Sequence, residues 1–166
     1  MSSGRLAAGA KRDHMNMKIS QEVIRKVRAR RERLRTAMDR LETALAAPVP
    51  GREPAWLKGV RAAFGELAAA MTDHVAKVEA ADGLFAQVRA DAPRLADKIR
   101  KLESEHAELA GAVRELAQRL DAAAPEANAD DVRGDLLRLL GRLAHHRQLG
   151  ADLLYQAYVV DVSVGD

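Results

Sequence analysis

The sequence predicts an all-α protein, an up-down-up-down four-helix bundle. Apolar residues make up 48% of the chain but aromatic residues only 3%, which leaves too few strand-forming side chains for a sandwich or a barrel. Four segments repeat apolar residues at helical spacing, and short breaks rich in Pro, Gly, Asn or Asp separate them. Because these breaks are short, neighbouring helices are expected to run in opposite directions around one core.

The first segment predicts a helix from about Ser20 to Ala46, which ends before the Pro48–Gly51 break. Its apolar residues recur at steps of three, four or seven, which is the pattern of one buried helix face. One position on this face is occupied by an arginine, Arg31 or its neighbour Arg30. The apolar positions are Val23, Val27, Leu34, Met38, Leu41 and Leu45.

The later segments predict helices over about residues 57–78, 95–120 and 132–160. Asn128 or Asp130 is placed to cap the start of the last helix. In each of these three helices, one histidine interrupts an otherwise apolar face. The three histidines are His74, His106 and His146.

Helix rise predicts that these polar exceptions lie at one level of the bundle. At 1.5 Å per residue, Arg31 and His106 lie roughly 17 and 20 Å from one end, and His74 and His146 lie roughly 20 to 22 Å from the same end. We therefore expect a buried polar layer. Imidazoles from facing helices, with carboxylates nearby, are how helical bundles bind iron, manganese or zinc ions.

Several short motifs, taken in order, resemble the hemerythrin-like, or HHE cation-binding, family over about residues 28–158. The resemblance implies an up-down four-helix bundle whose core histidines and carboxylates hold two oxo-bridged irons that bind oxygen or sense redox state. The motifs are Arg31-x-x-Leu34-x-x-x-Met38-x-x-Leu41-Glu42, His74-x-x-x-x-Glu79 with Gly83-Leu84-Phe85, Glu105-His106-x-x-Leu109, and His145-His146 running into Asp152-Leu153-Leu154-Tyr155.

The chain departs from the family pattern at three ligand positions. The first-helix histidine corresponds to Arg31, which cannot bind a metal ion. A second third-helix ligand would fall at Leu102 or Ala110, and a fourth-helix carboxylate would fall at Gly150. No oxo-bridged diiron centre is therefore expected, and the remaining ligand set suits one iron or zinc ion or none. That set is His74, Glu79, His106 and His146.

The polar core layer is expected to include Arg31, Glu103 and Gly150 as well. Glu103 lies three residues before His106, which gives a single Glu-x-x-His motif where ferritin-like diiron proteins use two. A buried guanidinium needs a charged partner. Arg31 is predicted to pair with Glu79, with Glu103 or Glu105 as second choices. The alternative is that Arg31 extends to solvent and Arg30 takes the apolar face.

Three functions stay open. The first is a degenerate hemerythrin-like bundle that binds a partner, or a small ligand in its core, without a stable metal. The second is a protein that keeps a single iron or zinc ion for oxygen, redox or metal sensing. The third, a small-molecule enzyme with core histidines as acid or base, is favoured less than a non-enzymatic role.

Composition also bounds location and partners. The chain has no cysteine, and no segment resembles a signal peptide or a membrane span, which predicts a cytoplasmic protein without membrane contact. Basic residues concentrate between Lys18 and Arg35 without interleaved aromatics, which predicts a solvated helix face and not a nucleic-acid site. Residues 1–17 are expected to be a disordered leader, with residues 1–14 possible vector sequence, residues 18–160 the bundle, and residues 161–166 a tail that could support a homodimer.

Overall fold

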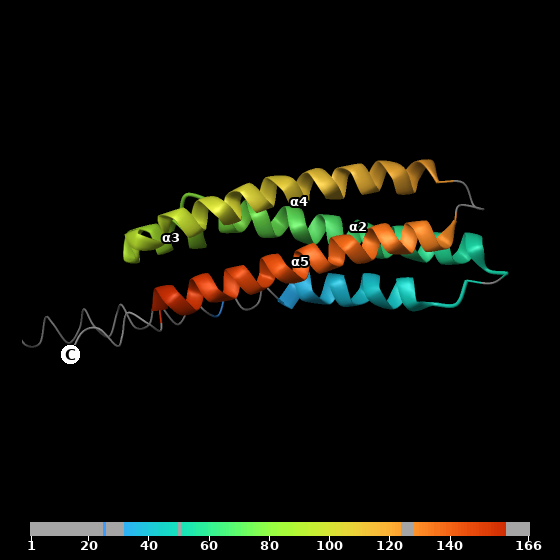
Figure 1. Ribbon diagram of the computed structural model, residues 1–166, viewed down its shortest axis with the longest axis horizontal. Coiled ribbons are helices and arrows are strands. Elements are labelled where there is room, and N and C mark those ends of the chain that lie inside the picture. Colours follow the sequence, from blue (N-terminus) through green and yellow to red (C-terminus); the bar gives the residue numbers. More distant parts are fainter. Residues whose placement is uncertain (1–24, 26–31, 50, 124–127, 159–166) are drawn as a thin grey trace, which may run out of the picture.

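The computed structural model describes residues 25, 32–49, 51–123 and 128–158. Every regular element in these ranges is helical, so the all-α prediction is confirmed. The first helix covers residues 32–46, and α2 (Glu53–Val78), α3 (Leu84–Asp91), the 3-10 turn η1 (Pro93–Leu95), α4 (Ala96–Ala122) and α5 (Ala129–Tyr158) follow. The first helix, α2, α4 and α5 lie side by side along the long axis, with α3 at one end (Figure 1). None of the described helices is long and apolar enough to cross a membrane.

Helix α3 lies in a segment that the sequence predicts as a break. It forms directly after Gly83 and buries Leu84, Phe85 and Val88. A Cβ atom at Gly83 would lie 2.5 Å from the carbonyl oxygen of Val78, so the tight turn out of α2 requires glycine. After this turn, α3 lies at one end of the bundle (Figure 1), where Phe85 contacts the ring of His106.

A layer of histidines separates the core into two apolar clusters. The larger cluster includes Leu67, Leu109 and Leu143. The smaller cluster, toward α3, includes Phe85 and Leu153. In each of three helices the histidine lies between a residue of one cluster and a residue of the other: Met71 and Val78 flank His74, Leu109 and Leu102 flank His106, and Leu143 and Leu153 flank His146.

Side chains satisfy backbone groups at two helix ends. The guanidinium of Arg61 on α2 donates to the carbonyl oxygens of Leu120 and Ala123 at 2.7 and 2.8 Å, which satisfies the end of α4. At the start of α5, the side-chain oxygen of Asn128 accepts a hydrogen bond from the amide of Asp130 at 3.0 Å. Of the two predicted capping residues, the structure therefore uses Asn128.

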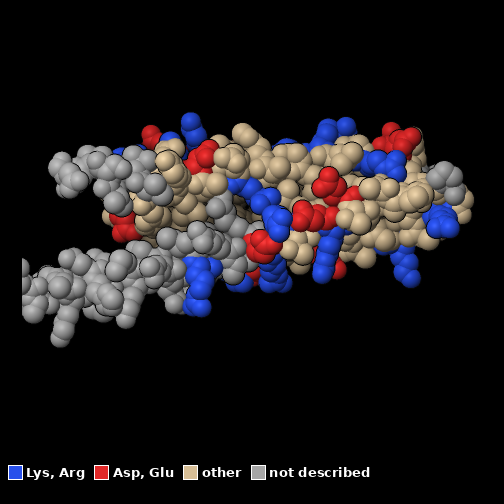
Figure 2. Space-filling model, turned by 90° about the horizontal axis from the view of Figure 1, so that it is seen from below, with Lys and Arg blue, Asp and Glu red and all other residues tan. Residues whose placement is uncertain are grey.

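Basic and acidic side chains are interspersed over the face shown in Figure 2. Two ion pairs join the first helix to α2: Arg40 lies 2.6 Å from Glu66, and Arg33 lies 3.4 Å from Asp73. Exposed pairs of this kind contribute less than about 1 kcal/mol each. The bundle is therefore held together mainly by its apolar clusters.

Candidate metal centre

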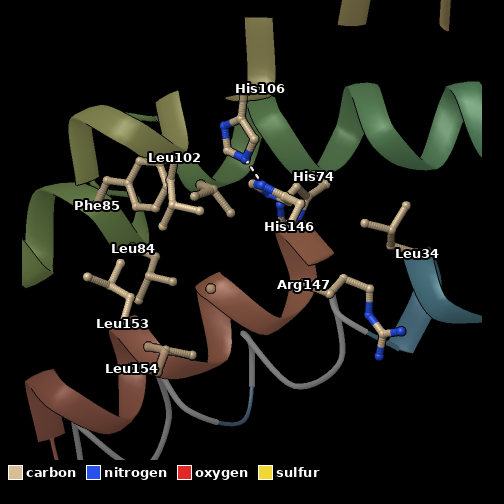
Figure 3. A pocket seen from close by; sticks show the side chains of 12 residues that line it. Leu34, His74, Leu84, Phe85, Leu102, His106, His146, Arg147, Leu153 and Leu154 are labelled. Carbon is tan, nitrogen blue, oxygen red and sulfur yellow. Dashed lines mark hydrogen bonds between the residues drawn. The ribbon is translucent and has the colours of Figure 1, made fainter. Parts of the chain in front are cut away.

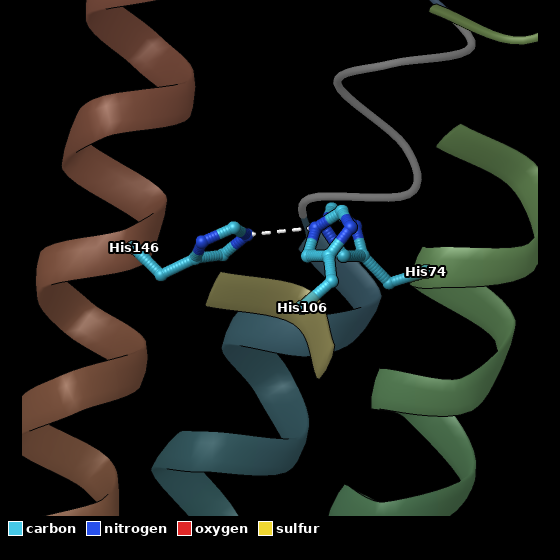
Figure 4. A group of neighbouring side chains, drawn as sticks. All are labelled: His74, His106 and His146. Carbon is cyan, nitrogen blue, oxygen red and sulfur yellow. Dashed lines mark hydrogen bonds between the residues drawn. The ribbon is translucent and has the colours of Figure 1, made fainter. Parts of the chain in front are cut away.

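Three imidazoles from three helices meet in the core. His74 lies on α2, His106 on α4 and His146 on α5, and the three side chains point toward one another (Figure 4). One ring nitrogen from each lies within 4.8 Å of the other two. His106 and His146 are almost fully buried, with 2% and 4% of the residue surface exposed. Burying several imidazoles together is costly unless their nitrogen atoms are satisfied.

Two carboxylates satisfy the outer nitrogens of two of these histidines, His106 and His146. An oxygen of Glu79, at the end of α2, lies 2.6 Å from Nδ1 of His106. An oxygen of Glu105 on α4 lies 2.9 Å from Nδ1 of His146. The Nε2 atoms of the two histidines therefore face each other, 3.0 Å apart. A carboxylate behind the outer nitrogen is the usual arrangement of a metal-binding histidine, because it fixes the ring and the tautomer.

The electrostatics of the site favour a neutral imidazole at His106. Burial, together with the positive charge that His146 can carry, lowers the pKa of His106 to about 4. Burial and the nearby charge of Glu103 raise the pKa of Glu79. Both directions favour a proton on Glu79 over a second proton on His106 in the contact between the Glu79 carboxyl group and Nδ1 of His106.

A small apolar cavity adjoins the inner nitrogens. Its volume is about 40 Å³, enough for a metal ion with a bound water or for a molecule of similar size. Phe85 stacks on the ring of His106, with the centroids 5.6 Å apart and the planes at 15°. Gly150 leaves space on the α5 side, because a Cβ atom there would meet no atom within 4 Å. Leucines form most of the remaining wall, and the guanidinium of Arg147 points away from the histidines (Figure 3).

The remaining site residues of the sequence prediction take different positions. Glu79 contacts the outer nitrogen of His106 and not the inner one, so it has the position of an orienting partner. Glu103 lies toward the surface, where both of its oxygens bind Arg89 of α3 at 2.7 Å. Gly150 lines the cavity as part of the layer. Arg31 lies outside the described residues, and so does its predicted pairing.

The sequence predicts Glu105 only as a second-choice partner for Arg31, and not as a contact of a core histidine. Its side chain is 29% exposed, and it lies one position before His106 on α4, off the apolar face. The sequence does carry one signal for this contact: Glu105 directly precedes the core histidine His106, and the neighbouring helix carries the core histidine His146. A residue next to a core histidine, on a helix that packs against α5, can reach the histidine of the neighbouring helix.

A comparison with models of known protein families identifies the family of this chain. The model of the hemerythrin HHE cation-binding domain matches residues 22–158. The chain therefore belongs to the hemerythrin HHE cation-binding domain family. This confirms the resemblance seen in the sequence. No curated protein and no solved structure matches the chain.

The three histidines of this hemerythrin-family chain could hold a metal ion. Within the described residues, His74, His106 and His146 are the one group of three or more histidine, aspartate or glutamate side chains close enough to share a metal. Two nitrogens on one tetrahedral zinc, at 2.0–2.1 Å each, lie about 3.3 Å apart, which is close to the observed 3.0 Å. Leu102 and Gly150, two of the positions at which the family resemblance placed further ligands, line the cavity.

Proposed function

We propose that this chain is an up-down-up-down four-helix bundle that binds a single divalent transition-metal ion through His74, His106 and His146. The observation that carries the proposal is the orientation of the imidazoles. Carboxylates hold the Nδ1 atoms of His106 and His146, so both Nε2 atoms are directed inward to where His74 also reaches. Three neutral imidazoles suit zinc or ferrous iron.

The cavity suggests what such an ion would do. Three protein ligands leave an open position on a tetrahedral ion, and a bound ion supplies Lewis acidity there. The apolar wall formed by Phe85, Leu102 and Leu153 excludes bulk water from that position. A volume of about 40 Å³ admits only a very small ligand. The proposed role is therefore the sensing or handling of the ion or of a small molecule bound to it, and not diiron oxygen carriage.

Cobalt substitution tests this proposal. Metal-free protein titrated with Co²⁺ is expected to develop visible absorption bands of the strength typical of a tetrahedral site, saturating near one ion per chain. The bands should be absent from the His146→Ala variant and unchanged in His145→Ala, because His145 is exposed on the same helix. Weak bands typical of hexaaquo cobalt in the wild-type protein would refute the proposal.

One observation favours a second candidate, a small-ligand-binding bundle that works without metal. The chain from Glu79 through His106 and His146 to Glu105 is complete without an ion, because each of its contacts is 3.0 Å or shorter. The cavity would then bind a small apolar ligand directly. Failure of cobalt uptake, together with ligand-induced shifts in the NMR signals of Phe85, would support this candidate.

A further inference from the structure

The carboxylate of Glu105 connects the surface of the bundle to a buried histidine, His146. On one side, Glu105 lies in an open groove between α4 and α5, beside Glu108 and Arg142. On the other side, its Oε2 lies 2.9 Å from Nδ1 of His146, whose side chain is 5% exposed. An ionised carboxylate accepts hydrogen bonds only, so this contact requires the proton of His146 to be on Nδ1.

The consequence for His146 is a fixed tautomer. A neutral imidazole carries one ring proton, and the nitrogen without it is the one that can bind a metal. With the proton held on Nδ1 by Glu105, the lone pair of Nε2 is directed toward His106 and His74. The ring is therefore set in both orientation and tautomer for an ion at the centre of the layer.

The two carboxylates of the chain differ in their place. Glu79 lies at the end of α2 and contacts His106 of α4, whereas Glu105 lies on α4 and contacts His146 of α5. We infer that Glu105 is a positioning residue that sets His146 as the pre-organised ligand of the histidine centre, an inference that extends the metal-binding function proposed above.

Glu108 offers a matched control. It lies on the same helix, one turn after Glu105, and in the same groove. Its side chain is 65% exposed, and its nearest ionic partner is Arg142 at 3.6 Å. Removing Glu108 takes one acidic group from the groove without touching His146, so it separates a specific contact from a general change in surface charge.

Two readouts test the role of Glu105. In metal-free protein labelled with ¹⁵N-histidine, two-bond ¹H–¹⁵N correlations show which nitrogen of His146 is protonated. Wild-type protein and Glu108→Ala should carry the proton on Nδ1, and Glu105→Ala should shift it toward Nε2. Zinc affinity, measured against a competing chelator, should fall 10- to 100-fold in Glu105→Ala and stay unchanged in Glu108→Ala. Glu105→Gln keeps an acceptor oxygen and should restore the tautomer and part of the affinity.

The outcomes distinguish this inference from the proposed function. If wild-type protein takes up no zinc, the proposed function is refuted, while the tautomer comparison in metal-free protein still decides the role of Glu105. If Glu105→Ala keeps the Nδ1 proton of His146, or binds zinc as tightly as wild type, Glu105 is not a positioning residue. Circular dichroism of each variant establishes that the helices are intact before either readout is compared.

Discussion

The Nε2 atoms of His106 and His146 lie 3.0 Å apart, at the middle of a chain of three short contacts that runs from Glu79 to Glu105. Each contact needs one proton, because two lone pairs at this distance repel. Two neutral imidazoles supply two protons, so the chain holds one more. The raised pKa of Glu79 and the lowered pKa of His106 favour Glu79 as the carrier of that third proton.

Metal uptake should release this proton. When both Nε2 atoms bind an ion, the two Nδ1 protons face the carboxylates and no place remains for the third. We expect zinc binding to release protons from the metal-free protein, measured by weak-buffer titration. The Glu79→Gln variant should release fewer, because its amide cannot carry the exchangeable proton. Equal release by the two proteins would argue against the proton assignment.

Acid should destabilise the metal-free protein through His106. Its pKa of about 4 lies below the ordinary value of 6.5, because burial disfavours the charged ring. The unfolded chain then binds more protons between these values. The contribution of His106 to the free energy of unfolding is thus complete above pH 6.5 and is lost as the pH falls toward 4. The loss from this residue alone is about 3 kcal/mol.

Urea denaturation from pH 7.5 to 4 measures this loss. Glu79, whose pKa is raised, works in the opposite direction, since its contribution is present at low pH and is lost as the pH rises. As the pH decreases, the free energy of unfolding should therefore fall more steeply in Glu79→Gln and less steeply in His106→Gln. An unchanged pH profile in His106→Gln would contradict the assignment, and His145→Gln is the control for an exposed histidine.

The structure also explains which parts of the fold could be predicted. The three histidines were found because helical periodicity records which side of a helix a residue faces, and because helix rise is constant. Helix α3 was missed because eight residues are too few for a periodic signal, and Gly83 and Pro93 on either side are typical of a loop.

The contacts within the site depend on how far and in which direction each side chain extends. The spacing of residues along the sequence does not predict this. Glu79 was predicted as a ligand because it follows His74 closely in sequence, yet its oxygen lies on the outer nitrogen of His106. Glu105 lies off the apolar face, and its contact crosses from α4 to α5. Which ring nitrogen a carboxylate meets is set by rotamers and helix packing together.

Gly83→Ala should destabilise the protein and loosen α3. The new Cβ would lie 2.5 Å from the Val78 oxygen and 2.8 Å from the Ala80 oxygen, and neither backbone atom can move freely. We expect a loss of about 1 to 3 kcal/mol in denaturant melts. Gly59→Ala is the matched control, because its Cβ would meet no atom within 4 Å and alanine should stabilise the helix by about 1 kcal/mol. Equal effects at the two positions would show that the turn tolerates a side chain.

Tyr158 should ionise at unusually high pH. Burial, the charge of Asp91 and the 3.4 Å hydrogen bond that its hydroxyl donates to Asp91 raise its pKa to about 12. Because the folded value exceeds the ordinary 10, the stabilising contribution is complete below pH 10 and is lost as the pH rises toward 12. Absorbance at alkaline pH should show this late step, which Tyr158→Phe removes and Asp91→Asn moves to lower pH. A late step that persists in Tyr158→Phe would assign it to another group.

Metal stoichiometry is the most direct test of a single-ion histidine centre. Protein reconstituted with zinc or with ferrous iron, freed of excess metal and assayed by elemental analysis, should contain about one ion per chain. His74→Ala should lose most of it, because His74 is one of three ligands. The aerobic iron-loaded protein should lack the ultraviolet charge-transfer bands of an oxo-bridged pair. Two tightly held irons per chain with those bands, or full occupancy in His74→Ala, would contradict the account.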